Sequence, residues 1–226
     1  GRGRARLDVV VVQGARSIWS HGMLPAATAL AAAAGLVVTR ELYVMGRPLT
    51  AEDTVDPALA QGLSVRPFQP GVDDERWVAL NAAAFASHPE QGRLTLADLH
   101  ERMAQPWFDP AGLLLVVDDT TEEVVAFHWT KVEPVAPPAV PRGEVYVVGV
   151  DPAYQGRGLG GPVTSLGLAR LARLGLAEVE LYVDGDNTAA RRTYTRLGFR
   201  DTAVHAQYGT QTHPGADLTE PDRIAP

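Results

Sequence analysis

The chain has 226 residues, a length that fits one large domain, or one whole domain with part of another. Apolar residues make up 46% and charged residues 21%, which is a globular composition and excludes wholesale disorder. The formal net charge of -7 argues against a general nucleic-acid binder, and the lack of cysteine excludes disulfides, thiolate metal sites and a cysteine nucleophile.

In chain order, four zones are distinguished by their composition. Residues 1–49 are apolar and rich in alanine, whereas residues 50–62 are polar and interrupted by proline, which predicts a linker. We expect residues 63–210 to form the main domain. Residues 211–226 contain few apolar side chains and predict a flexible tail.

Apolar periodicity predicts alternating strands and helices in the main domain, which indicates an α/β or α+β fold with one mixed sheet. The Thr95–Asp98 spacing fits a helix-capping pattern. In chain order the sequence predicts a strand at 63–68, helices at 73–86 and from Thr95, a hairpin of strands at 113–117 and 124–132, a strand at 144–150, a helix at 158–174, a strand at 178–183, a helix at 187–197 and a strand at 199–208.

An internal repeat relates the first zone to the end of the main domain. At an offset of 163 residues, Trp19 aligns with Tyr182 and Gly35 with Gly198. The shared order of strand, turn, helix, glycine and strand predicts that residues 1–49 are the C-terminal remnant of a first copy of the domain. Chance similarity is the alternative, and the β-branched residues 9–12 favour a strand where the repeat needs the end of a helix.

The longest apolar stretch, residues 26–38, is too short to span a bilayer, and the first residues lack a signal-peptide pattern. We therefore expect a cytoplasmic monomer with no membrane or nucleic-acid partner. The six histidines have no metal-ligand spacing, so no metal is predicted. Because the chain begins Gly-Arg-Gly-Arg without Met, we expect a fragment or a processed product.

The most informative segment is VVGVDPAYQGRGLGGP, residues 147–162. A buried strand leads into a glycine-rich loop, and a helix follows. Glycines let several backbone N–H groups point to one place, and the start of a helix adds unpaired donors and the positive end of its dipole. This arrangement predicts a seat for a pyrophosphate, and an ordinary strand-to-helix turn is the alternative.

Three phosphate-binding patterns compete for this loop. Gly156-x-Gly158-x-x-Gly161 satisfies the dinucleotide fingerprint, but residues 151–155 separate it from the strand, and too few residues follow for further parallel units. The Walker pattern Gly-Lys-Ser/Thr is absent. Gln155-x-x-Gly158-x-Gly160 fits better, and it resembles the acetyl-CoA pyrophosphate signature of the GNAT acetyltransferase superfamily.

A second segment, DNTAARRTYTRLGF at 186–199, resembles the superfamily's N-x-x-A-x-x-x-Y-x-x-x-G-F pattern. The resemblance implies the GNAT fold, with a mixed and mostly antiparallel sheet, splayed central strands and flanking helices, and it implies acetyl-CoA as acetyl donor. The cofactor-binding residues that it implies are Val148, Gly149, Val150, Gln155, Gly156, Arg157, Gly158, Leu159, Gly160, Gly161, Asn187, Thr188, Ala189, Ala190, Arg191 and Arg192.

A closer resemblance is to the mycothiol synthase family, tandem GNAT proteins whose C-terminal half is active. It rests on HPEQG at 88–92, FHWTK at 127–131 and GEVYVVGVDP at 143–152. That family acetylates the cysteinyl amine of desacetylmycothiol, so the resemblance implies this small-molecule acceptor. It also implies that the front of the first copy, with its own cofactor loop, is missing, and Gly185 stands where the family usually has Ala. The acceptor-binding residues that it implies are Glu90, Lys131, Glu144 and Tyr182.

Two side chains are candidates for proton transfer. Glu144 begins the central strand, where the period of two places it on the same face as Tyr146 and Val148, and its carboxylate could take a proton from an amine directly or through water. Tyr194 lies two turns after Asn187 and could donate a proton to the leaving thiolate. From the residues alone, a solvated glutamate and a core aromatic are equally good interpretations, and the resemblance favours the catalytic roles.

The predicted reaction is direct N-acetylation within a ternary complex. The alternatives are a GNAT enzyme acting on another amine, such as a protein N-terminus, and a non-catalytic acyl-CoA-binding module. NAD(P) binding is a further alternative. No Gly-x-Ser-x-Gly elbow is present, which disfavours a hydrolase.

Overall fold

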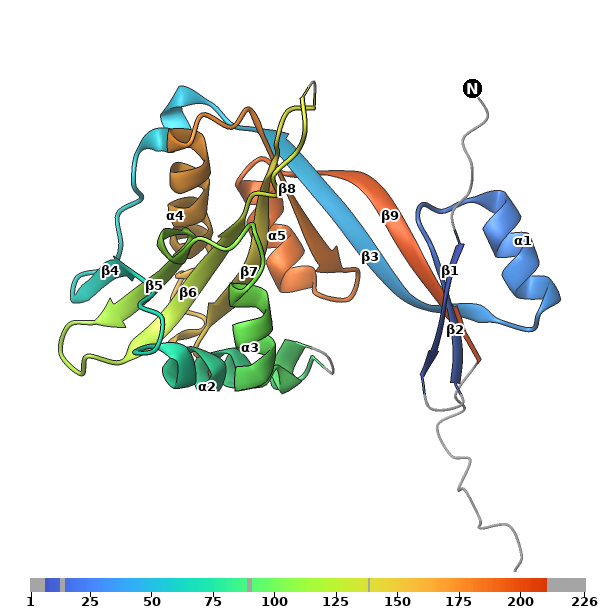
Figure 1. Cartoon of the computed structure of the whole chain (residues 1–226), viewed down its shortest axis with the longest axis horizontal. Coiled ribbons are helices and arrows are strands. Elements are labelled where there is room, and N and C mark those ends of the chain that lie inside the picture. The colour runs from blue at the N-terminus through green and yellow to red at the C-terminus, as the bar shows by residue number, and fades with distance from the viewer. Residues whose placement is uncertain (1–6, 13–14, 89–90, 138, 211–226) are drawn as a thin grey trace, which may run out of the picture. The chain divides into compact units, whose positions relative to one another are not determined.

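The computed structural model describes residues 7–12, 15–88, 91–137 and 139–210. These residues form two compact units (Figure 1). Unit 1 holds the described residues up to Tyr43, Asp184–Asp186 and those from Ala203 onward, and unit 2 holds Val44–Val183 and Asn187–Thr202. Strands β3 (Val37–Pro48) and β9 (Arg200–Gly209) each contribute residues to both units.

Unit 2 contains a mixed sheet with the order β3–β8–β7–β6–β5–β4. Neighbours from β4 to β7 pair antiparallel, whereas β7 and β8 pair parallel. The predicted mixed and mostly antiparallel sheet is therefore confirmed. Its further strands are β4 (Leu63–Pro67), β5 (Leu113–Asp118), β6 (Val124–Lys131), β7 (Gly143–Val150) and β8 (Glu178–Asp184).

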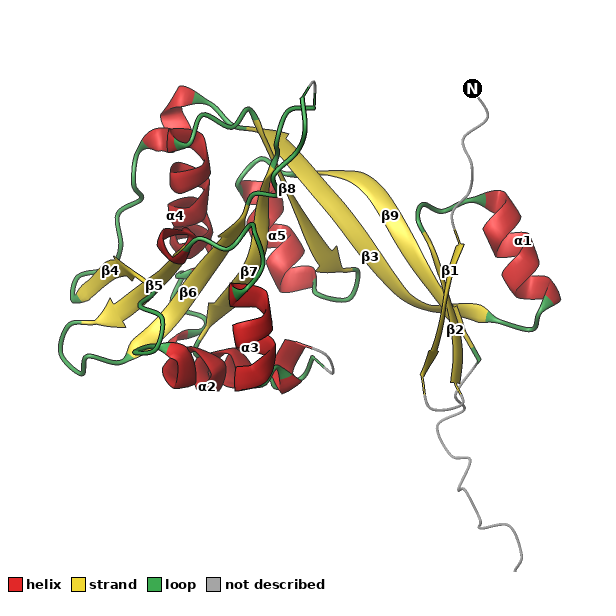
Figure 2. Cartoon of the chain, viewed as in Figure 1, coloured by secondary structure: helices red, strands yellow, loops and turns green. Residues whose placement is uncertain are grey.

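Helices cover both faces of this sheet (Figure 2). Leu115 and Phe127 pack with Trp77 of α2 (Asp74–Ala84) and with α3 (Leu96–Met103). Val116 and Ala126, one residue away on the same two strands, pack with α4 (Gly160–Arg173). Because neighbouring strand residues point to opposite faces, the two clusters lie on opposite sides of the sheet. The last helix of this unit is α5 (Thr188–Arg196).

Unit 1 is built from β1 (Leu7–Val12), β2 (Ala15–Ser20), α1 (Pro25–Ala33), the start of β3 and the end of β9. Strand β2 pairs antiparallel with both β1 and β9. Ala31 of α1 packs against Ala206 and Tyr208 of β9, and the Tyr208 hydroxyl lies 3.0 Å from the Thr28 hydroxyl. This buried contact and the hydrogen bond hold α1 against β9.

The predicted internal repeat is visible in the element bounds. Strand β2, helix α1 and strand β3 each start 163 residues before β8, α5 and β9 respectively. Gly35 and Gly198 both have positive φ, at 70° and 88°, in the turn after the helix. The strand, helix, glycine and strand therefore recur with unchanged spacing, although β1 is a strand where the repeat would need the end of a helix.

The main-domain elements lie where the sequence predicts them, with small shifts at their ends. The clearest shift is α4, which begins at Gly160 and not at Gly158, because Gly158 has a φ of 80° that a right-handed helix does not allow. In the part of the chain that the structure describes, no helix combines the length and the apolar character needed to cross a bilayer.

Candidate active site

The centre of the site is a gap in strand pairing between β7 and β8. The two strands pair at Gly143–Val179, Glu144–Glu180 and Val145–Leu181, and no later pair joins them, although both strands continue. On its other side, β7 stays paired with β6 as far as Val150. Residues 146–150 therefore present an open backbone edge, as the predicted splay requires, and an extended ligand can add to such an edge.

A β-bulge lies at the start of this gap. Trp129 of β6 pairs with Val147 and the next residue, Thr130, pairs with Val145, so Tyr146 is an extra residue on β7. Tyr146 and Val147 pack with the α2–α3 cluster, whereas Val148 packs with the α4 cluster. The expectation that Val148 shares a face with Glu144 was wrong, because the bulge interrupts the period of two.

The glycine-rich loop that precedes α4 has open space beside its backbone. Gly156 and Gly158 have φ values of 74° and 80°, and a Cβ at Gly156, Gly158 or Gly161 would meet nothing within 4 Å. Leu159, the N-cap of α4, makes no side-chain capping bond. The first-turn N–H donors of a helix need external partners, so this loop and helix start fit a pyrophosphate.

Two side chains attach the loop to its surroundings. The Gln155 amide donates to the Val150 carbonyl at 3.0 Å, which ties the loop back to β7. The Arg157 guanidinium lies 4.7 Å from the centre of the Tyr154 ring, and the Tyr154 hydroxyl donates to Asp118 Oδ2 at 2.7 Å. This hydrogen bond lowers the pKa of Asp118. Sequence reasoning singled out Arg157 but missed Tyr154, because its bond to Asp118 joins residues that are far apart in the chain.

Replacing Gly158 with alanine should weaken acetyl-CoA binding about tenfold. Positive φ costs an L-residue roughly 1–2 kcal/mol, and about 1.4 kcal/mol corresponds to a tenfold change in affinity. Calorimetric titration with acetyl-CoA measures this change. Gly71→Ala is the matched control, because Gly71 also has positive φ and a Cβ added there would meet nothing within 4 Å, but Gly71 lies outside the site. Equal weakening in both variants would contradict a specific role for the loop.

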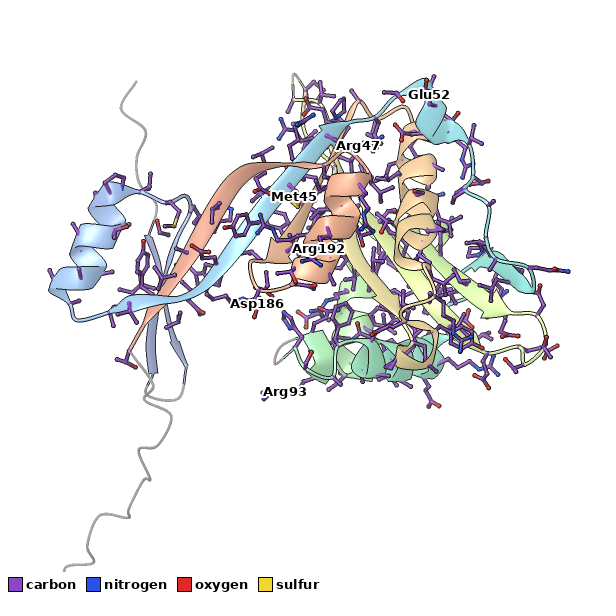
Figure 3. All side chains as sticks on the ribbon, turned by 180° about the vertical axis from the view of Figure 1, so that it is seen from behind. Met45, Arg47, Glu52, Arg93, Asp186 and Arg192 are labelled. Carbon is purple, nitrogen blue, oxygen red and sulfur yellow. The ribbon has the colours of Figure 1, made fainter. Side chains whose placement is uncertain are left out.

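The second predicted cofactor segment lies beside the first. A Cβ on Gly160, at the start of α4, would lie 3.9 Å from Thr193 of α5. Asn187 caps α5 by accepting from the Ala190 N–H at 3.1 Å. Arg191 forms a 2.9 Å ion pair with Asp201. Asn187, Thr188, Ala189 and Arg192 are exposed at this end of α5. Figure 3 labels Arg192 on this helix.

Glu144 is half-buried beside a lysine. Lys131 Nζ lies 3.6 Å from its carboxylate and 2.6 Å from that of Glu133. Burial raises the pKa of Glu144, Lys131 opposes this shift, and the negative charge of Glu180 adds to it. A carboxylate with a raised pKa is better matched to accepting a proton near neutral pH.

Tyr194 lies on α5 and packs edge-on against Phe199, with 5.9 Å between the ring centres. Burial raises the pKa of Tyr194 to about 12. The phenol therefore keeps its proton throughout the usual working range of pH. A group in this state can act as a proton donor.

The predicted acceptor residues are only partly brought together. Lys131 Nζ lies 5.3 Å from the Trp107 ring centre and 5.5 Å from that of Tyr146, so its ammonium is enclosed by aromatic rings as well as carboxylates. Tyr182 is exposed, and its hydroxyl donates to Glu180 at 3.3 Å. Glu90 lies outside the described residues. Trp107 was missed by sequence reasoning, because nothing in its local sequence places it near this strand.

His128 is a packed residue, as expected. It is fully buried, its Nδ1–H donates to the Val163 carbonyl of α4 at 2.9 Å, and burial lowers its pKa to about 4. Within the described ranges, no group of three or more His, Asp or Glu side chains could hold a metal ion.

The parted strands, open glycine loop and following helix are those of an acyl-CoA-dependent acetyltransferase fold. Residues 77–199 match the model of the acetyltransferase (GNAT) family. A GCN5-related N-acetyltransferase from Sphaerobacter thermophilus is 25% identical with a TM-score of 0.68, covering 88% of this chain and 60% of that one. A tandem GNAT protein from the clavulanic acid biosynthesis pathway is 18% identical with a TM-score of 0.58, covering 93% of this chain and 64% of that one.

Curated relatives narrow this class. The mycothiol acetyltransferase of Kytococcus sedentarius is 53% identical over 195 residues, which are 85% of this chain and 64% of the relative. That of Catenulispora acidiphila is 50% identical over 214 residues, which are 92% of this chain and 67% of the relative. The chain therefore belongs to the mycothiol acetyltransferase family within the GNAT fold, and it spans about two thirds of the length of these relatives.

Proposed function

We propose that this protein is an acetyl-CoA-dependent N-acetyltransferase that acetylates the cysteinyl amine of desacetylmycothiol to give mycothiol. The open edge of β7 beyond Val145, with Glu144 at the start of the same strand, is the observation that carries the proposal. Relatives named mycothiol acetyltransferase support the choice of acceptor.

The described residues fit acetyl-CoA. The N–H groups of the 155–161 loop and the α4 start suit its pyrophosphate, and the open edge at Val148–Val150 suits its pantetheine arm. When bound, it supplies the acetyl group as a thioester. The exposed Asn187 and Arg192 at the start of α5 are the proposed contacts to the nucleotide end.

Glu144 is the proposed base. Its carboxylate accepts the proton of the attacking amine, directly or through water, while the new bond forms between the amine nitrogen and the acetyl carbon. Lys131 keeps a positive charge near this carboxylate, which limits how far burial can raise its pKa. Backbone N–H groups of β7 near Val148 and Val150 stabilise the negative charge that develops on the carbonyl oxygen.

Tyr194 is the proposed acid. As the bond between the acetyl carbon and sulfur breaks, the phenol donates its proton to the departing thiolate. Tyr194→Phe should lower kcat about 100-fold, while the dissociation constant of acetyl-CoA stays unchanged. Because burial raises its pKa to about 12, wild-type activity should not decline through Tyr194 ionisation below about pH 11. Steady-state rates against pH test both points, and a wild-type rate in the variant would contradict the assignment.

The proposal is tested by calorimetry with acetyl-CoA followed by rate measurements with desacetylmycothiol and with a peptide bearing a free N-terminus. Acetylation of desacetylmycothiol alone supports the proposed acceptor. Acetylation of the peptide in preference to desacetylmycothiol would contradict it and favour another amine. Binding of acetyl-CoA without turnover of either acceptor would favour a binding module.

We further propose that the protein works as a monomer in the cytoplasm. The chain has no cysteine that would need an oxidising compartment. Analytical ultracentrifugation at several protein concentrations measures the molecular mass in solution and so tests the monomer. A mass that rises with concentration would contradict it.

A further inference from the structure

Tyr146 occupies a special position beside the proposed base. It is the extra residue of the β7 bulge, two residues after Glu144, and it packs on the side of the sheet that holds the α2–α3 cluster. Lys131 pairs with Glu144 across the strands, and its ammonium lies over the Tyr146 ring. The phenol and the Glu144 carboxylate are therefore neighbours at the point where β7 and β8 separate.

The Tyr146 ring is held in place by other aromatic rings. Its centre lies 5.1 Å from that of Trp107 and 5.3 Å from that of Trp129, both in edge-on geometry. Such aromatic pairs prefer defined orientations, so the ring has little freedom to turn away. The fixed ring sets the direction in which its hydroxyl points.

The hydroxyl itself is only half satisfied. Arg102 Nε, from α3, donates to the Tyr146 oxygen at 3.2 Å, and a second guanidinium nitrogen donates to the Asp98 carbonyl at 3.0 Å. An arginine cannot accept a hydrogen bond, so the O–H hydrogen of Tyr146 needs another partner. Among the residues that the structure describes, no group accepts it and no carboxylate forms an ion pair with Arg102.

We propose that Tyr146 is an acceptor-binding residue that donates its O–H to a carbonyl oxygen adjacent to the reacting amine, and that Arg102 is its positioning residue. The inference rests on the proposed function and names the acceptor class as an aminoacyl amide. Two side chains two residues apart on one side of a strand are separated by roughly 7 Å. Glu144 and Tyr146 can therefore hold the amine and the neighbouring carbonyl of one aminoacyl group.

The test compares two acceptors in wild-type and Tyr146→Phe protein. One is desacetylmycothiol, and the other is its reduced analogue, in which a methylene group replaces the cysteinyl carbonyl. Tyr146→Phe should raise the KM of desacetylmycothiol about 3- to 10-fold, the range of a single neutral hydrogen bond, and leave the KM of acetyl-CoA unchanged. It should leave the KM of the reduced analogue unchanged, because that acceptor has no oxygen at this place.

Arg102→Lys is the second variant, and Tyr43→Phe, which removes a phenol hydroxyl in unit 1, is the matched control. Arg102→Lys should raise the KM of desacetylmycothiol in the wild-type background but not in the Tyr146→Phe background. An equal change for both acceptors, or no change for either, would overturn the inference while the proposed function stands. If wild-type protein binds acetyl-CoA but acetylates neither acceptor, the proposed function itself has failed.

Discussion

Replacing Glu144 with glutamine should lower kcat/KM for the acceptor about 10²- to 10⁴-fold, the usual contribution of a positioned acid or base. Glutamine has nearly the same shape but cannot accept the amine proton. The start of β7 should keep its structure, and acetyl-CoA affinity should be unchanged because the loop and the open edge are not altered. Initial rates and calorimetric titration of the same preparations measure the two effects separately.

The assignment of Glu144 as the base also predicts the direction in which the wild-type rate changes with pH. Only the carboxylate form of Glu144 can accept a proton, and burial raises its pKa above the ordinary value. The rate should therefore fall as the pH drops through this raised pKa, and Glu144→Gln should lack this fall.

Glu180→Gln is the matched control for this assignment. Glu180 pairs with Glu144 across the first part of β7 and β8, and its negative charge helps to raise the Glu144 pKa. Removing that charge should move the acidic limb of the rate profile to lower pH while the variant stays active. A Glu144→Gln variant with a wild-type profile would show that another group accepts the proton.

Replacing Gly167 with alanine should destabilise the protein by about 1–3 kcal/mol, the usual cost of overpacking a buried site. A Cβ at this position would lie 2.1 Å from the nearest carbon of the His128 ring. The ring is fully buried and bonded to the Val163 carbonyl, so it cannot move aside easily. Because the start of α4 is part of the proposed pyrophosphate seat, acetyl-CoA affinity should fall as well. Urea unfolding and calorimetry measure these changes.

Gly161→Ala on the same helix separates overpacking from helix propensity. Its Cβ would meet nothing within 4 Å, and alanine is a better helix former than glycine, so stability should be unchanged or higher. Adding His128→Ala to Gly167→Ala should remove the clash, so the double variant should lose less stability than the two single changes sum to. Full additivity would contradict the packing argument.

Several features were predictable because they depend on residues close together in the chain. The Thr95–Asp98 capping box is confirmed, with the Thr95 N–H donating to the Asp98 carboxylate at 2.7 Å and the Asp98 N–H donating back to the Thr95 hydroxyl. The glycine loop and the helix after it also follow from local conformational preferences. Even the late start of α4 has a local cause, the positive φ of Gly158.

Other features of the site could not be predicted from the chain alone. The bulge at Tyr146 exists only because β7 pairs with β6 in a shifted register. Arg102 and Trp107 reach Tyr146 from a part of the chain about 40 residues earlier, and no periodicity connects them. Sequence reasoning could therefore name Glu144 and Lys131, but not Arg102, Trp107 or the bulge beside them.

The fold class, the order of strands and helices, and the glycine-rich loop that we propose as a pyrophosphate seat all followed from the amino-acid sequence. Those properties arise from interactions that span a few residues and from the apolar pattern of each element. Three features emerge only in the folded chain: the point where β7 leaves β8, the face that Val148 occupies, and the combined effect of burial, Lys131 and Glu180 on the pKa of Glu144. The physical reason is that strand register, burial and electrostatic fields depend on distances between segments that are far apart in the chain.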